Sequence, residues 1–327
     1  MLLFSPNHSA PFAREIARHL NVSLGASEER EFDGGEHKMR ALEDVTGQDV
    51  FVIQNLCGDE HASANDKLCR LLFFAGSLKD AGAARVTACL PYLAYARKDR
   101  RTQPNDPTTT RYLAAMFEAV RIDRVIVLDV HNEAAFDNAF RCTTTRIEAM
   151  STFADALAHE LSGDGVVVAS PDAGGIKRAQ RFRETLAARL QSDVGFAFME
   201  KRRAKGVVSG ETLVGEVAAR DVLIFDDMIA SGTTILRAAT AARRAGARRV
   251  LALASHAAFQ PAAACLFESE GPDAVLVSDS LPIRPPFDTF LPDKLRVCSV
   301  APLFARTIAA LSSSASPGRD PRIHAPS

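Results

Sequence analysis

Two adjacent acids and a Ser-Gly-Thr-Thr turn follow one short apolar run of the chain. Residues Val222–Phe225 are typical of a buried strand, and Asp226 and Asp227 come directly after them. The turn at Ser231–Thr234 opens a helical stretch, and such a turn at a helix N-terminus presents backbone N–H groups to a phosphate. The carboxylates suit ribose hydroxyl groups or a phosphate-bound Mg2+. The order of these features predicts a sugar-phosphate site; the alternative is an ordinary strand–turn–helix corner with a solvated acid pair.

Two cationic segments could bind further phosphates. Lys201-Arg202-Arg203 follows a candidate strand, and three neighbouring cations there would repel one another without an anion to share. The run Tyr95–Arg101 is basic and continues into Thr-, Pro- and Asn-rich residues, which is typical of a loop that closes over polyphosphate. Taken alone, the first segment also fits a solvated basic tip, and the second a solvated loop.

Two more strand ends carry polar groups. Asp129 and His131 follow an apolar run, and His131 could ligate a metal or contact a phosphate. Asp172 precedes Gly174-Gly175 at the start of a helical stretch, where it could hold Mg2+. Ligands of open α/β sheets gather at the carboxyl ends of strands. The alternatives are a hydrogen-bonded structural His and an N-cap Asp.

Short apolar runs alternate with amphipathic stretches, which predicts α/β structure with mainly parallel sheets covered by helices. The expected strands are Val50–Ile53, Arg85–Leu90, Arg124–Leu128, Gly165–Ala169, Val194–Phe198, Val222–Phe225, Arg249–Ala254 and Ala274–Val277. The expected helices are Asn65–Ala81, Thr109–Val120, Gly175–Leu190 and Thr233–Ala245.

A weak internal repeat indicates two similar doubly wound halves. Residues 48–56 echo 220–228, and residues 81–86 echo 245–250 in the same order. Gln54 and Asn55 stand in the first half where the second half has its acid pair, so we expect the second half alone to hold the sugar phosphate. The Thr143–Thr145 run interrupts the pattern, which predicts domains at 1–145 and 146–311. Residues 312–327 are polar and broken by Pro and Gly, which predicts a disordered tail.

Composition narrows the class of protein. The chain of 327 residues has 39 basic and 40 acidic residues, so charge implies neither a nucleic-acid nor a membrane partner. The six cysteines form no CxxC pair and are expected to be reduced thiols. No apolar run approaches the roughly 20 residues that span a bilayer. A soluble, cytoplasmic protein is expected.

Seven segments occur in the order found in the ribose-phosphate diphosphokinases, also called PRPP synthetases, and the chain resembles this family from about Phe32 to Leu303. The segments are Phe32–Glu36, Tyr95–Arg101, Asp129–His131, Ser170–Gly175, Lys201–Arg203, Asp226–Thr234 and Ser299–Leu303.

The resemblance implies transfer of diphosphate from ATP to the C1 hydroxyl of ribose 5-phosphate, with Mg2+ as cofactor and a homo-oligomer (dimer or hexamer) as the assembly. It assigns Lys201 and Arg203 to catalysis and associates His131 and Asp172 with Mg2+. The ATP-binding residues implied are Phe32, Gly34, Gly35, Glu36, Arg97 and Lys98, the first group reaching a neighbouring subunit's site. The residues implied for ribose 5-phosphate are Arg203, Asp226, Asp227, Ala230, Ser231, Gly232, Thr233 and Thr234.

Three positions depart from the family pattern: Gly34 replaces an acid, Lys98 replaces a Gln, and Ala230 replaces the third acid of the sugar loop. Two alternatives remain open. A phosphoribosyltransferase would share the Asp226–Thr234 loop but has no need of the adenine segment or the Lys201 cluster. A catalytically silent regulatory paralogue would bind without turnover, although Lys201, His131 and Asp172 are all retained.

Overall fold

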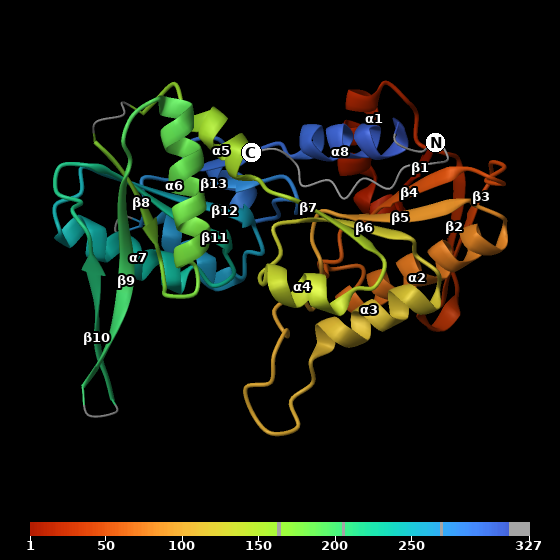
Figure 1. Cartoon of the computed structure of the whole chain (residues 1–327), viewed down its shortest axis with the longest axis horizontal. Helices are drawn as coiled ribbons and strands as arrows, with labels where there is room; N and C mark the ends of the chain where they lie inside the picture. The colour runs from red at the N-terminus through yellow and green to blue at the C-terminus, as the bar shows by residue number, and fades with distance from the viewer. Residues whose placement is uncertain (162–164, 205–206, 269–270, 314–327) are drawn as a thin grey trace.

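Two sheets organise the chain (Figure 1). The computed structural model describes residues 1–161, 165–204, 207–268 and 271–313, with the side chains of 201–211 excluded. The first sheet has five parallel strands in the order β1-β4-β5-β6-β7. Their bounds are Leu2–Phe4, Asp49–Ile53, Arg85–Leu90, Arg124–Leu128 and Thr143–Ile147. The first half also contains α1 Ala10–Leu20, the hairpin of β2 Ser27–Glu31 and β3 His37–Ala41, α2 Ala64–Asp80, α3 Thr109–Ala119 and α4 Glu133–Ala139.

The second sheet has seven strands in the order β10-β9-β8-β11-β12-β13-β14, all parallel except β10, which pairs antiparallel with β9. In chain order from β8, their bounds are Val166–Ser170, Gly195–Ala204, Val207–Val214, Asp221–Met228, Arg249–His256, Ala274–Ser278 and Leu295–Cys298. The accompanying helices are α5 Met150–Leu157, α6 Ile176–Leu190, α7 Thr233–Arg244 and α8 Ala301–Ser313.

The internal repeat corresponds to a repeated topology. Strands β8-β11-β12-β13-β14 follow the same parallel order as β1-β4-β5-β6-β7. The echo of 48–56 in 220–228 falls on β4 and β11, and the echo of 81–86 in 245–250 leads into β5 and β12. Both pairs of similar segments therefore occupy equivalent strands, which confirms the prediction of two similar α/β halves.

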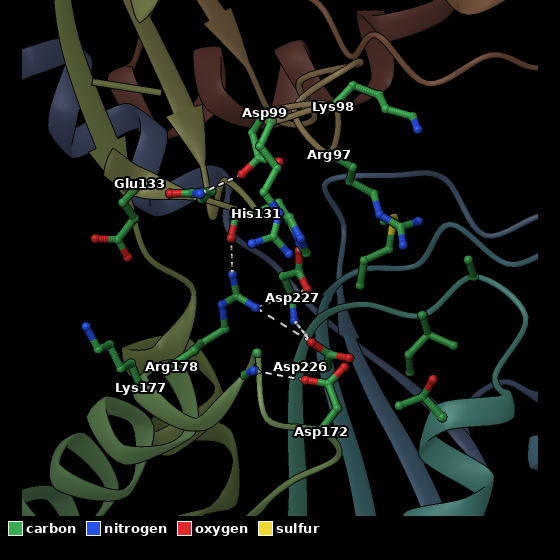
Figure 2. Close-up of a pocket in the computed structure, with 18 of the residues that line it drawn as sticks. Arg97, Lys98, Asp99, His131, Glu133, Asp172, Lys177, Arg178, Asp226 and Asp227 are labelled. Carbon is green, nitrogen blue, oxygen red and sulfur yellow. Dashed lines mark hydrogen bonds and ion pairs between the residues drawn. The ribbon is translucent and has the colours of Figure 1, made fainter. Parts of the chain in front are cut away.

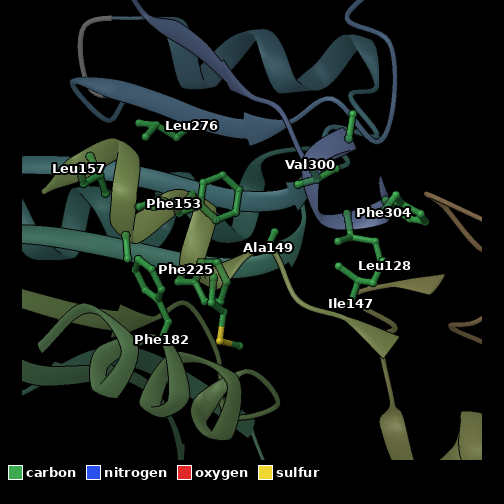
Figure 3. Packing of buried hydrophobic residues seen from close by; sticks show 14 of the residues in the cluster. Leu128, Ile147, Ala149, Phe153, Leu157, Phe182, Phe225, Leu276, Val300 and Phe304 are labelled. Atoms are coloured by element: carbon green, nitrogen blue, oxygen red, sulfur yellow. The ribbon is translucent and has the colours of Figure 1, made fainter. Parts of the chain in front are cut away.

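Hydrophobic packing joins the two halves into one body. Leu128 and Ile147 of the first sheet belong to the same buried cluster as Phe153 of α5 and Phe225 of the second sheet (Figure 3). Phe225 stacks on Phe182 of α6, with ring centroids 4.5 Å apart. Because this interface is apolar and continuous, the halves are not expected to move as free domains.

Two helices pack at the junction between the halves. Helix α5 follows β7 of the first sheet but packs against α6 of the second half. Helix α8 follows β14 of the second sheet but packs against α1 of the first half, as Figure 1 shows. Helix α8 thus packs on the half opposite to the strand that it follows, whereas α5 begins the second half.

Both predicted chain boundaries fall inside elements of the structure. The Thr143–Thr145 run does not interrupt the pattern, because it forms most of β7, the edge strand of the first sheet. We therefore propose that the domain boundary lies between β7 and α5 rather than after residue 145. The predicted tail begins at Ser312, but α8 includes Ser312 and Ser313. Residues 314–327 lie outside the described part of the chain.

Candidate active site

A cavity of about 1020 Å³ lies where the carboxyl ends of strands from both halves meet. Residues that follow β6, β8 and β11 line it, together with the loop after β5 and the first turns of α6 and α7. Its volume is at the upper end of the range for ligand pockets, so it has room for more than one small substrate. Almost all of the lining groups that can carry chemistry are charged or hydroxyl-bearing, which favours phosphorylated ligands.

The centre of the site is an acid pair held by a histidine and an arginine (Figure 2). The His131 Nδ1 atom lies 2.9 Å from the Asp227 Oδ2 atom. The Arg178 Nη1 atom lies 3.0 Å from Asp227 Oδ1 and 3.6 Å from Asp226 Oδ1. Since His131 belongs to the first half and the other three to the second, the cluster crosses the interface.

Burial and neighbouring charges shift the pKa values of the two carboxyl groups in opposite directions. Burial and then the neighbouring Asp227 charge raise the pKa of Asp226 well above its usual value. Burial alone would also raise the pKa of Asp227. However, the hydrogen bond with His131 and the charge of Arg178 outweigh burial and lower that pKa below its usual range. The pair therefore offers one strongly ionised carboxylate and one that a cation or hydroxyl donor would help to ionise.

The turn after the acid pair has the geometry of a helix N-terminus open to the cavity. Ser231, Gly232 and Thr234 line the cavity, and Thr233 begins α7. Gly232 has φ +75°, and a Cβ there would lie 2.9 Å from the Leu266 side chain. The turn thus requires glycine on both conformational and steric grounds. The N–H groups of the first helical turn have no partner within the helix, so they can bind an anion.

Asp172 occupies the corresponding turn before α6. Its Oδ1 atom accepts a hydrogen bond from the Gly175 backbone N–H at 3.0 Å, which fixes the carboxylate at the cavity wall. Lys177 and Arg178 follow on the first turn of α6 and also line the cavity. The sequence prediction did not include these two cations, although they follow the Asp172–Gly175 turn directly.

The basic loop of the first half reaches the same cavity. Arg97 and Lys98 both line it, and Figure 2 shows them on the side of the cavity that the first half forms. The Asn132 side-chain amide donates to Asp99 Oδ2 at 2.5 Å, which ties this loop to the segment that carries His131. Arg181 and Glu133 also line the cavity, and the sequence prediction did not include them. Arg181 of α6 forms an ion pair with Glu133 of the first half at 2.6 Å.

The structure brings together most, but not all, of the predicted site residues. Those that line the cavity are Arg97, Lys98, His131, Asp172, Asp226, Asp227, Ala230, Ser231, Gly232 and Thr234. Phe32, Gly34, Gly35 and Glu36 do not: they form the exposed turn between β2 and β3, and Phe32 is 48% exposed. Lys201 and Arg203 lie on β9, next to the β8 strand that leads to Asp172, but their side chains are outside the described set.

The carboxylates suit a metal that is shared with a substrate. Within the described side chains, no group of three or more His, Cys, Asp and Glu residues is placed to enclose a metal ion. Mg2+ usually takes one or two carboxylates and completes its shell with water and substrate phosphates. Asp172 and the Asp226–Asp227 pair fit that pattern, because they place carboxylate oxygens on the wall of a cavity that is open to a polyphosphate.

The chain matches two family models. Residues 1–120 match the N-terminal domain of ribose phosphate pyrophosphokinase, and residues 145–265 match the phosphoribosyl transferase domain. Within the described residues, no helix is long and apolar enough to cross a membrane.

Full-length relatives agree with these matches. The chain is 34% identical over 316 residues to a ribose-phosphate pyrophosphokinase of Pasteurella multocida, with 96% of each chain covered. It is 34% identical over 318 residues to that of Neisseria meningitidis serogroup A, covering 97% of this chain and 93% of the relative. The crystal structure of phosphoribosylpyrophosphate synthetase from Mycobacterium smegmatis superposes with a TM-score of 0.83 at 29% identity, covering 96% of this chain and 99% of the other. The chain belongs to the ribose-phosphate pyrophosphokinase family.

Proposed function

We propose that the chain transfers the β,γ-diphosphate of ATP to the C1 hydroxyl of ribose 5-phosphate and so supplies nucleotide biosynthesis. The C1 oxygen attacks the β-phosphorus of ATP, and the bond from that phosphorus to the oxygen bridging to the α-phosphorus breaks. AMP leaves with the bridging oxygen, and the hydroxyl proton passes to water. The observation that carries the proposal is one cavity lined by the Arg97–Lys98 loop of the first half and the acid pair and phosphate turn of the second.

Each part of the cavity has a role in this proposal. Ser231–Thr234 bind the 5-phosphate through the N-terminus of α7, and Asp226 and Asp227 bind the ribose hydroxyl groups. Arg97 and Lys98 bind the ATP phosphates. Such transfer needs little covalent help from a protein, so alignment and neutralisation of charge supply most of the acceleration.

Mg2+ and two further cations complete the proposed site. His131 and Asp172 would hold Mg2+, which supplies charge neutralisation on the ATP phosphates. Lys201 and Arg203 would stabilise charge on the transferred diphosphate, because β9 carries them past the strand end that leads to Asp172.

We also infer that the chain works as a homo-oligomer in the cytoplasm. The turn at Phe32–Glu36 is exposed and lies outside the cavity of its own chain. If this turn contacts adenine, it must do so in the cavity of a neighbouring subunit. A phosphoribosyltransferase is the less favoured function, because the chain has a complete first half that contributes His131 and the basic loop to the site.

The test is an assay with purified protein, ATP, MgCl2 and ribose 5-phosphate that follows AMP and PRPP together. Equal, sugar-dependent formation of both supports the proposal. Consumption of PRPP with an added base would instead identify a transferase, and the absence of AMP with any nucleotide would favour a silent paralogue.

Lys201→Ala tests the assigned catalytic cation. We expect turnover to fall by about 100-fold or more while the KM for ribose 5-phosphate changes little, because the lost interaction forms mainly in the transition state. Turnover close to that of the wild type would refute the role of Lys201.

A further inference from the structure

Asp129 is a buried acid at the edge of the site, outside the cavity itself. It directly follows β6, its residue is 9% exposed, and it does not line the large cavity. Its backbone has φ +37°, in the left-handed region that L-residues other than Asn, Asp and Gly rarely adopt. This conformation turns the chain from β6 toward His131, two residues later.

The Asp129 carboxylate links both halves through one oxygen. Its Oδ2 atom accepts hydrogen bonds from the Ala149 backbone N–H at 3.0 Å and from the Ser255 hydroxyl at 2.5 Å. Ala149 precedes α5, whereas Ser255 lies on β12 of the second sheet. The His256 Nε2 atom lies 3.2 Å from the carbonyl oxygens of Leu128 and Asp129, so β12 contacts this turn in two places.

The second half also holds the far end of the same segment. Arg178 donates to the His131 carbonyl oxygen at 3.1 Å, and the His131 ring contacts Asp227 at 2.9 Å. The segment Leu128–His131 is therefore fixed at one end by β12 and at the other by α6 and β11. The placement of the His131 ring depends on both attachments.

The repeated topology provides a comparison. Asp279 follows β13 as Asp129 follows β6, and it accepts a hydrogen bond from the Val300 backbone N–H at 2.8 Å, just before α8. Its second carboxylate oxygen accepts from the Ser299 hydroxyl at 2.5 Å, a neighbour within the same half. The cap of the following helix is thus common to both halves, whereas the hydrogen bond from the opposite sheet is specific to Asp129.

We propose that Asp129 is a positioning residue for the transfer reaction. It fixes the Leu128–His131 turn against β12. It thereby holds the His131 ring within hydrogen-bonding distance of Asp227 and close to the proposed phosphate-binding groups of the second half. The expected effect on turnover rests on the function proposed above. The effect on the hydrogen bond between His131 and Asp227 can be measured without any reaction.

Four variants separate the contributions of the Asp129 backbone conformation, its carboxylate, the hydrogen bond from Ser255 and the cap of α5. Asp129→Gly keeps the left-handed backbone and removes the carboxylate, whereas Asp129→Asn keeps an oxygen that can accept both hydrogen bonds. Ser255→Ala removes the hydrogen bond from the second half and leaves the cap of α5. Asp279→Ala is the matched control, because it removes the equivalent cap away from the cavity.

The first readout is the split between turnover and KM, measured alongside urea unfolding. We expect Asp129→Gly to lower turnover by about 10- to 100-fold, with a smaller change in the KM for ATP, because a displaced catalytic contact acts mainly in the transition state. Ser255→Ala should lower turnover by about three- to tenfold, and Asp129→Asn should restore it to within about threefold of the wild type. Asp279→Ala should lower stability while leaving the turnover of the folded fraction within about twofold of the wild type.

The second readout is the side-chain nitrogen resonance of His131 in protein labelled with 15N-histidine, assigned with His131→Gln. We expect Asp129→Gly and Ser255→Ala to shift this resonance away from its hydrogen-bonded position, and Asp279→Ala to leave it unchanged. Unchanged turnover and an unchanged resonance in both Asp129→Gly and Ser255→Ala would overturn the proposal. If Asp129→Gly does not fold, an unaltered His131 resonance in Ser255→Ala overturns it alone. A wild type that makes no PRPP refutes the proposed function instead, and the resonance then decides the positioning role.

Discussion

Replacing Arg178 by Met should destabilise the folded protein by about 3 kcal/mol, because the change leaves a buried acid pair without its cation. The Arg178 side chain is 16% exposed and that of Asp227 is 9% exposed, so little water can replace the guanidinium. Met preserves most of the apolar stem, which limits the loss of packing. The substitution therefore tests the charge more than the volume.

The magnitude follows from the contact distances. A unit charge pair at the 3.0 Å separation of Arg178 and Asp227 has a gross attraction of about 5.5 kcal/mol at an effective dielectric constant of about 20. The cost of taking both charges out of water cancels part of this attraction. Removal of one partner from a buried pair typically costs about 3–5 kcal/mol, and the remaining hydrogen bond between His131 and Asp227 places this case at the lower end.

The assay is urea unfolding of the wild type, Arg178→Met, Asp227→Asn and the double variant. The double-mutant cycle should give a coupling energy of about 2 kcal/mol for Arg178 and Asp227. Arg189→Met is the control on the same helix: its ion pair with Asp155 is largely exposed, so it should cost less than about 1 kcal/mol. A loss below about 1 kcal/mol for Arg178→Met, or a coupling energy near zero, would refute the reasoning that the cation neutralises a buried pair.

Two further predictions concern stability. Burial, with the nearby positive charge of Lys67, lowers the pKa of His8 from 6.5 to about 4. His8 is therefore protonated below about pH 6.5 in the unfolded chain but only below about pH 4 in the folded protein. Because the unfolded state binds more protons between these values, the stability of the fold decreases as the pH drops through this window. After allowance for the part of the ring that contacts water, we expect a loss of about 1 kcal/mol between pH 7 and pH 5. Urea unfolding of His8→Asn should show a smaller pH dependence, and an equal dependence would contradict the assignment. Phe225→Ala should cost about 3–5 kcal/mol, because it removes a ring that is fully buried and stacked on Phe182 in the core shared by both halves. A loss below about 2 kcal/mol by urea unfolding would mean that this core collapses into the space left by the ring.

Apolar patterning was sufficient to predict the central elements of both sheets. The expected strands Arg85–Leu90 and Arg124–Leu128 match β5 and β6 residue for residue, because strands covered on both faces are nearly continuous apolar runs. The β2–β3 hairpin was missed, since Ser27–Glu31 contains no apolar residue. Ion pairs support it instead, among them Glu28 with Arg40 across the hairpin at 2.5 Å.

The site was predictable where a motif follows a strand, and not where a single side chain reaches it from a helix. Asp172, Asp226 and Asp227 each follow an apolar run, and the topology brings those strand ends to one cavity. Arg178 has no such local signal, because its partners Asp227 and His131 are distant in sequence. Only the three-dimensional arrangement of α6 against β11 and the first half identifies it as the central cation of the site.

The end of β4 differs from the equivalent end of β11, which carries the acid pair. Gln54 and Asn55 follow β4 where Asp226 and Asp227 end β11, yet neither lines the cavity. The Gln54 side-chain amide donates to the Lys67 carbonyl oxygen at 2.6 Å, and the Asn55 backbone N–H donates to the Ser9 hydroxyl at 3.1 Å, so the first half closes this end with its own chain. Carboxylates there would be buried against acceptors such as the Lys67 carbonyl, which can donate no hydrogen bond. The first half therefore has no acid pair at this strand end and contributes from the end of β6 instead, where His131 contacts Asp227 of the second half.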